Sequence, residues 1–211
     1  MLLNYNTERN FFIFADMKRL LLFALLSLAA CTGKSLEPDA SWHELLDKSD
    51  QAAAAQQWED ATALALQALD AKDIEKGGKS LVLSHLAAID MATWRDSQGW
   101  EHAIEAESLA REEGIDSLLS LALLQKGKLL LFGAITEGEA QDAEALECLQ
   151  EAMLTSGENI PLKAEILLQQ SQAFIGLNRF NDPIDEELYA KAGECLRKAE
   201  DLAGPSAGMI S

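Results

Sequence analysis

Apolar and polar positions alternate with the period of an α-helix over most of the chain. From residue 41 onward, Ala and Leu recur three and four positions apart, so they gather on one face of a helix. Four long segments of this kind are each followed by another helical segment. The long segments cover residues 42–55, 81–94, 118–135 and 162–177. The pattern predicts an all-α fold built from about four helix-turn-helix units.

The second helix of each predicted hairpin carries a pair of alanines seven residues apart. The pairs are Ala61 and Ala68, Ala103 and Ala110, Ala145 and Ala152, and Ala192 and Ala199. The first three pairs recur every 42 residues, which indicates an internal repeat. Two small side chains on one helical face let a neighbouring helix approach closely. We therefore expect these alanines to be packing positions.

Aromatic residues keep the same register as the alanines. Trp58, Trp100 and Tyr189 stand three residues before the first alanine of their pairs, although Asp142 interrupts the series. An aromatic ring at the start of a second helix can fill the wedge beside the turn. We therefore expect these three rings to be packing residues of the repeat.

The stretch Gln57-Trp58-Glu59-Asp60-Ala61, with Ala68 seven residues later, resembles the second helix of the tetratricopeptide repeat (TPR) family. Gly133 falls where the first helix of that family places a glycine. Three features depart from the family: the period is 42 and not about 34 residues, most second helices lack a following proline, and the first-helix Trp and Tyr are largely missing. The chain is therefore best described as TPR-like.

This resemblance implies a short right-handed α-solenoid with an inner groove, because such hairpins bury a continuous core only by stacking. In the family, the first helices line that groove and hold peptides. Carried over by position, the groove here would be lined by His43, Leu46, Asp50, His85, Ala88, Arg95, Asp96, Leu130 and Glu137. The alternative is that these positions form a solvated helix face.

The N-terminal region has the pattern of an export signal. Lys18 and Arg19 precede an apolar run that ends in Leu28-Ala29-Ala30-Cys31. The run is too short to span a bilayer, which takes about 20 residues. The last four residues resemble the lipobox of bacterial lipoprotein precursors, and this implies that Cys31 is lipidated and becomes the new N-terminus. The alternative is an ordinary secretory peptide in which the cysteine is accidental.

These features divide the chain into four parts. Residues 1–30 are the expected signal peptide, with Met17 as the expected start, and residues 31–40 are a lipidated linker. Residues 41–203 form the repeat domain. Residues 204–211, which contain Gly and Pro, are expected to be a flexible tail.

Composition and charge narrow the range of partners. The chain is 48% hydrophobic, which is enough for a packed core, and its single Val leaves little to build a sheet. The formal net charge of −18 repels phosphate backbones and anionic lipid headgroups, so nucleic acid binding is not expected. Basic or neutral partners are favoured.

No catalytic or metal-binding motif stands out in the sequence, so we expect neither an enzyme nor a cofactor. His43 and His85 lie one repeat apart, which leaves a bridging metal as an alternative to surface or partly buried histidines. Cys148 and Cys195 occupy small apolar positions of the repeat. We expect them to be buried thiols, with a disulfide between them as the alternative.

Together these observations predict a membrane-anchored, periplasm-facing scaffold that binds another envelope protein or peptide. Thr32-Gly33 after the lipidated cysteine lacks the aspartate that retains lipoproteins at the inner membrane of enteric bacteria, which favours the outer membrane. The alternative function is an extracytoplasmic sensory or ligand-binding module of a signalling protein. The sequence does not name the partner or the oligomeric state.

Overall fold

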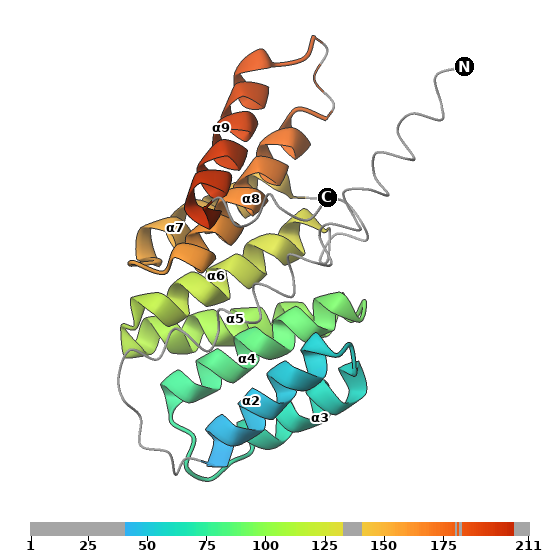
Figure 1. The fold of residues 1–211 in the computed structure, drawn as a ribbon, viewed down its shortest axis with the longest axis vertical. Coiled ribbons are helices and arrows are strands. Elements are labelled where there is room, and N and C mark those ends of the chain that lie inside the picture. The colour runs from blue at the N-terminus through green and yellow to red at the C-terminus, as the bar shows by residue number, and fades with distance from the viewer. Residues whose placement is uncertain (1–40, 133–140, 180, 182, 205–211) are drawn as a thin grey trace, which may run out of the picture.

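The computed structural model describes residues 41–204 except 133–140, 180 and 182, and these residues are all helix, turn or coil (Figure 1). No strand occurs among them, so the predicted all-α fold is confirmed for this part of the chain. The helices are α2 (Ser41–Ala54), α3 (Trp58–Leu69), α4 (Lys76–Ala92), α5 (Asp96–Glu113), α6 (Asp116–Leu131), α7 (Asp142–Thr155), α8 (Ile160–Leu177) and α9 (Glu186–Ala203).

These helices pack as four successive hairpins: α2 with α3, α4 with α5, α6 with α7, and α8 with α9. Each hairpin also contacts the next one through the following first helix, and α6 packs directly against both α4 and α8. Figure 1 shows the resulting stack, with α2 and α3 at one end and α9 at the other. The first helices α4, α6 and α8 therefore form one layer of neighbouring helices.

Several helix ends follow from local chemistry. Asn159 accepts a hydrogen bond from the Leu162 backbone N–H and so caps α8, which also has Pro161 in its first turn. Asp185 caps α9 by accepting from the N–H groups of Glu187 and Leu188. Gly114 ends α5 with a left-handed φ of 64°, a conformation that costs glycine little. These short polar signals set the hairpin boundaries.

All eight repeat alanines lie in the interior, where none is more than 3% exposed. Five of them pack among leucine and isoleucine side chains in a main core that runs from Trp42 in α2 to Ile166 in α8, namely Ala61, Ala68, Ala110, Ala145 and Ala152. A separate cluster that contains Leu167, Cys195 and Ala199 holds α9 against α8. The stack is thus stabilised by close approach of helices across small side chains.

Serine side chains on the first helices add direct hydrogen bonds within three hairpins. Ser49 donates to the Ala61 carbonyl, Ser80 to the Ala106 carbonyl and Ser120 to the Ala152 carbonyl, at 2.6, 2.8 and 2.7 Å. Each serine is buried, so the bond satisfies a hydroxyl that would otherwise be costly inside the core. The close approach allowed by alanine brings the two backbones within reach of so short a side chain.

The predicted aromatic packing residues have different environments. Trp58 is the first residue of α3, whereas Trp100 lies one turn inside α5, and both are partly buried against the core. Tyr189 is 49% exposed, so the prediction that it fills a wedge is wrong. The reason is that α9 packs on α8 and belongs to the last hairpin of the described stack. Gly133 lies outside the described residues.

Candidate functional site

The predicted groove residues do not form one open surface. Leu46, His85 and Leu130 are buried within the helix stack, and Ala88 is buried as well, so their assignment to an open groove is wrong. Helical spacing alone does not show that α4 and α6 are enclosed on several sides by α3, α5 and α8. His43, Asp50, Arg95 and Asp96 are partly buried, and Glu137 lies outside the described residues.

The layer of first helices holds three buried oxygens that have no hydrogen-bond partner. They are Ser84 Oγ on α4, Gln125 Oε1 on α6 and Gln169 Oε1 on α8. Each of these helices contributes one such oxygen, and the three helices lie side by side. A buried polar oxygen without a partner costs about 1–3 kcal/mol. Each of these three oxygens could therefore accept a further hydrogen bond.

Ser49, His85 and Asp50 form a polar cluster between α2 and α4. Ser49 Oγ lies 2.8 Å from His85 Nε2, and Asp50 Oδ1 lies 3.0 Å from His85 Nδ1. These are the residue types of a hydrolytic triad. Ser49 and His85 are fully buried, however, and the Ser49 hydroxyl donates to the Ala61 carbonyl. The hydroxyl is thus committed to the fold and out of reach of a substrate.

The same contacts bear on the suggested metal site. His85 Nε2 lies 2.8 Å from Ser49 Oγ, and His85 Nδ1 lies 3.0 Å from Asp50 Oδ1. The His43 ring stacks on the Trp42 ring with centroids 3.5 Å apart. Within the described ranges, no three His, Cys, Asp or Glu side chains are placed to hold a metal.

A second buried cluster is centred on Asp90 at the end of α4. Its carboxylate lies 2.9 Å from Arg95 Nη2 and 2.7 Å from His102 Nδ1. Arg95 also donates from Nε to Thr93 Oγ1 and from Nη2 to Thr62 Oγ1, at 3.0 and 2.8 Å. These contacts fix the guanidinium between α3 and the turn that connects α4 to α5.

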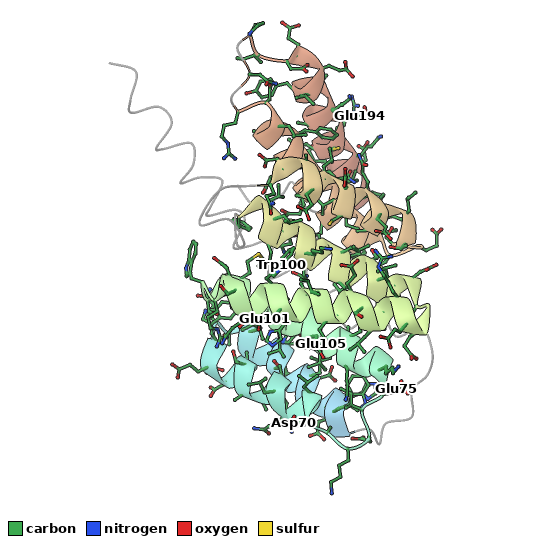
Figure 2. The ribbon with its side chains drawn as sticks, turned by 180° about the vertical axis from the view of Figure 1, so that it is seen from behind. Asp70, Glu75, Trp100, Glu101, Glu105 and Glu194 are labelled. Atoms are coloured by element: carbon green, nitrogen blue, oxygen red, sulfur yellow. The ribbon has the colours of Figure 1, made fainter. Side chains whose placement is uncertain are left out.

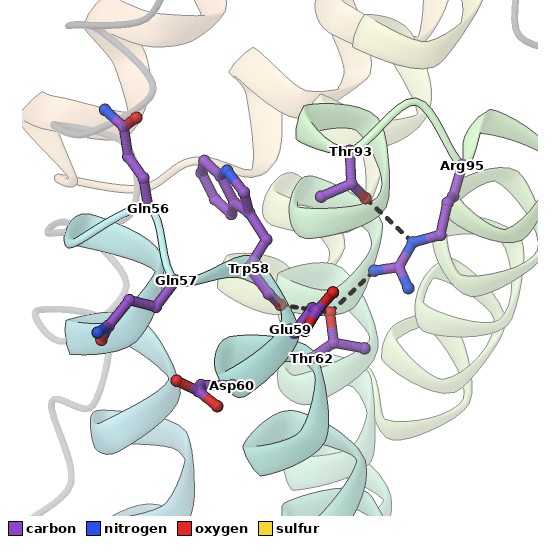
Figure 3. A pocket seen from close by; sticks show the side chains of 8 residues that line it. All are labelled: Gln56, Gln57, Trp58, Glu59, Asp60, Thr62, Thr93 and Arg95. Atoms are coloured by element: carbon purple, nitrogen blue, oxygen red, sulfur yellow. Dashed lines mark hydrogen bonds between the residues drawn. The ribbon is translucent and has the colours of Figure 1, made fainter.

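Arg95 lines a hollow of about 630 Å³ between two successive hairpin turns (Figure 3). The α2–α3 turn and the first turns of α3 supply one wall, from Gln56 to Thr62, and Thr93 with Arg95 supplies the other. The wall on α3 presents the Trp58 ring and the carboxylates of Glu59 and Asp60. Arg95, a predicted groove residue, therefore belongs to an edge hollow between turns.

Charge is distributed unevenly between the two sets of helices. The first helices α2, α4, α6 and α8 carry as many Lys and Arg residues as Asp and Glu residues. Among the second helices, α3 and α7 have acidic residues and no Lys or Arg, and α5 has only Arg111. Figure 2 shows part of this acidic surface, including Glu101 and Glu105 on α5. The net negative charge thus resides mainly on the second helices.

Cys148 and Cys195 are free thiols and both are buried. Burial raises the pKa of the Cys148 thiol to about 11, and it raises the pKa of Cys195 as well. Because the thiolate is the reactive form, we expect both residues to react slowly with Ellman's reagent at pH 8 in the native protein and fast in 6 M guanidinium. Fast labelling of either residue without unfolding would contradict their placement.

Sequence reasoning missed the hollow and both buried clusters. Their members come from different helices, and only Asp50, Trp58, His85 and Arg95 were expected to have a role, in each case one other than the contacts that the structure shows. The one usable signal was the close spacing of Trp58 with Glu59 and Asp60, which lie on one exposed helix start. No protein-family model, no curated protein and no solved structure matches this chain.

Proposed function

We propose that the protein is a lipid-anchored scaffold of the bacterial envelope that faces the periplasm and holds another protein or peptide on its layer of first helices. The three unpaired oxygens of Ser84, Gln125 and Gln169 carry this proposal. They are buried acceptors, so a bound polypeptide segment would reach them only where the first helices part, and its backbone N–H groups would then satisfy them. The layer is also free of the net negative charge of the second helices, so it does not repel an apolar or neutral segment.

The geometry of the layer suits a segment that crosses the helices. Neighbouring helix axes are typically 8–10 Å apart, and an extended chain advances about 3.3 Å per residue. An extended segment would thus cross one helix about every third residue. We take the hairpins to be TPR-like and stacked with a right-handed sense, in line with the alanine register and the pairing of helices along the stack.

Membrane attachment is assigned to Cys31. None of the helices between Ser41 and Ala203 that the structure describes is long and apolar enough to cross a bilayer. Residues 32–40 can reach at most about 30 Å when extended, because each residue spans at most about 3.3–3.6 Å. A lipidated Cys31 would keep the first hairpin close to the membrane, preferably the outer one.

Replacement of Cys31 by Ala should abolish metabolic labelling with palmitate and leave the unprocessed precursor. The thiol is the atom that would receive the lipid, and Ala has none. Cys148→Ala is the matched control, because that buried thiol should have no part in labelling. Labelling that survives in Cys31→Ala would rule out the lipoprotein assignment.

The scaffold function is tested by crosslinking the full-length protein in its native envelope and identifying captured proteins by mass spectrometry. Ser84→Ala combined with Gln125→Leu removes two unpaired acceptors. This variant should keep or raise the melting temperature, because an unsatisfied buried group is replaced by an apolar one. It should also lose the specific partner.

Gln150→Leu is the control, since Gln150 is exposed on α7, a second helix. A partner that is retained by the double variant, or lost equally with Gln150→Leu, would contradict binding at the layer of first helices. The same comparison tests the sensory alternative: no captured protein under any growth condition would favour a module for small ligands.

A further inference from the structure

We propose that the hollow between the α2–α3 and α4–α5 turns is a second binding site, which takes a Lys or Arg side chain of a polypeptide together with its adjacent backbone carbonyl. This site is separate from the layer of first helices and lies at one edge of the stack (Figure 3). It goes beyond the proposed scaffold function, because it needs neither the lipid anchor nor the three buried oxygens.

The pairing of Arg95 with Asp90 leaves Glu59 and Asp60 as the net charge of the hollow, which is negative. The Arg95 guanidinium is paired with the buried Asp90 carboxylate at 2.9 Å, so its positive charge is already balanced inside the fold. Glu59 and Asp60 on the opposite wall have no hydrogen-bonded cation among the described residues and are exposed. A cation that enters the hollow would therefore meet two carboxylates in the first turn of α3 that lack a salt-bridge partner in the described part of the chain, and carboxylates make charge-assisted hydrogen bonds with ammonium or guanidinium groups.

The Trp58 ring adds a second feature that favours a cation. Its indole is partly buried against the core at the first position of α3, and Trp58 lines the same hollow as Glu59 and Asp60. A Lys ammonium or Arg guanidinium over an indole face gains about 0.5–2 kcal/mol. The aliphatic stem of such a side chain also packs well on an aromatic surface.

Arg95 can bind a backbone carbonyl of the bound polypeptide. Its Nε and Nη2 are engaged by Thr93, Thr62 and Asp90, while Nη1 has no hydrogen-bond partner among the residues that the structure describes. The guanidinium is thus held rigidly with one donor edge free and partly exposed. Because the nearby carboxylates disfavour an anion, the acceptor that fits this edge is a neutral carbonyl, as in a peptide backbone.

The neighbouring backbone conformation is unusual. Gln56 and Trp94 have φ values of 60° and 62°, and they are the two non-glycine residues with positive φ in the described part of the chain. Trp94 directly precedes Arg95, and its side chain is 79% exposed. Left-handed backbone at a bulky residue costs about 1–2 kcal/mol. Such strain beside a hollow is consistent with a binding role for these turns.

The test measures binding of the peptide acetyl-(Lys-Gly)₃-amide to the full chain in a non-ionic detergent, by calorimetry and by NMR of the Trp58 indole. We expect saturable binding and a shifted Trp58 signal. Glu59→Gln combined with Asp60→Asn should weaken binding about tenfold or more, since each carboxylate contributes a charge-assisted contact. Glu101→Gln combined with Glu105→Gln makes the same change in net charge on the exposed face of α5, away from the hollow, and should change binding by less than about twofold.

Two further measurements, with the Arg95→Lys variant and with spermidine, distinguish a peptide ligand from a simple polyamine. Arg95→Lys keeps the positive charge next to Asp90 but removes the planar fork, so it should weaken the lysyl peptide and leave spermidine unaffected. Spermidine that binds as tightly as the peptide, equal losses in the two acidic double variants, or no saturable shift of Trp58 would each overturn the proposal. None of these outcomes bears on capture at the layer of first helices, which is measured in the envelope with different variants.

Discussion

Replacement of Glu165 by Ala should lower the free energy of unfolding by about 3–5 kcal/mol, the cost typical of breaking a buried ion pair. Glu165 on α8 lies 3.2 Å from Lys128 Nζ on α6, and both side chains are more than 90% buried. Gln169 also donates to the Glu165 carboxylate, at 3.1 Å. Without Glu165, the Lys128 ammonium would remain in the interior with no counter-charge.

Urea denaturation followed by circular dichroism measures this loss. The double variant Lys128→Met with Glu165→Leu removes both charges, and it should recover most of the stability because two apolar side chains of similar volume replace the pair. Glu151→Ala is a control for a more exposed pair: its partner Arg111 is 44% exposed, and we expect a loss of at most about 1 kcal/mol. A Glu165→Ala protein that is as stable as Glu151→Ala would contradict burial of the α6–α8 pair.

The Lys128–Glu165 pair also connects the third hairpin to the fourth. It joins two neighbouring first helices beside Gln125 and Gln169, two of the residues with unpaired oxygens. The seam between the third and fourth hairpins is therefore more polar than the alanine and leucine packing within the hairpins. A polar network that is only partly satisfied stabilises a junction less than apolar packing does.

The helices themselves could be predicted from sequence because their information is local. The predicted first helix at residues 42–55 matches α2 (Ser41–Ala54), and the one at residues 162–177 matches α8 (Ile160–Leu177). The periodicity of Ala and Leu and the polar caps are enough to produce this result. The burial of the repeat alanines follows from the same local pattern, since small residues on an apolar face rarely serve any other purpose.

The groove could not be predicted, because exposure depends on how many neighbours a helix has. His85 and Leu130 lie on first helices at positions that a helical wheel places on the inner face, yet both are buried. Only the packing of α4, α6 and α8 against one another reveals this. The buried contacts of Arg95 were equally hidden, since Thr62 and Asp90 belong to different hairpins.

Replacement of Gly127 by Ala should destabilise the protein by about 1–3 kcal/mol, although alanine is the better helix former. Gly127 lies inside α6, where an added Cβ would sit 2.8 Å from Leu149 Cγ and 3.4 Å from the Ala145 carbonyl oxygen on α7. Leu149 is fully buried and has little room to move. The two helices would have to separate, and the Ser120 bond to α7 would lengthen.

Gly193 in α9 is the matched position, because an added Cβ there meets no atom within 4 Å. Gly193→Ala should raise stability by about 0.5–1 kcal/mol through helix propensity alone. Thermal and urea melts of the two variants should therefore move in opposite directions from the parent protein. A stabilised Gly127→Ala would mean that α6 and α7 are farther apart than described, and the alanine and glycine positions would then no longer explain why the hairpins pack so closely.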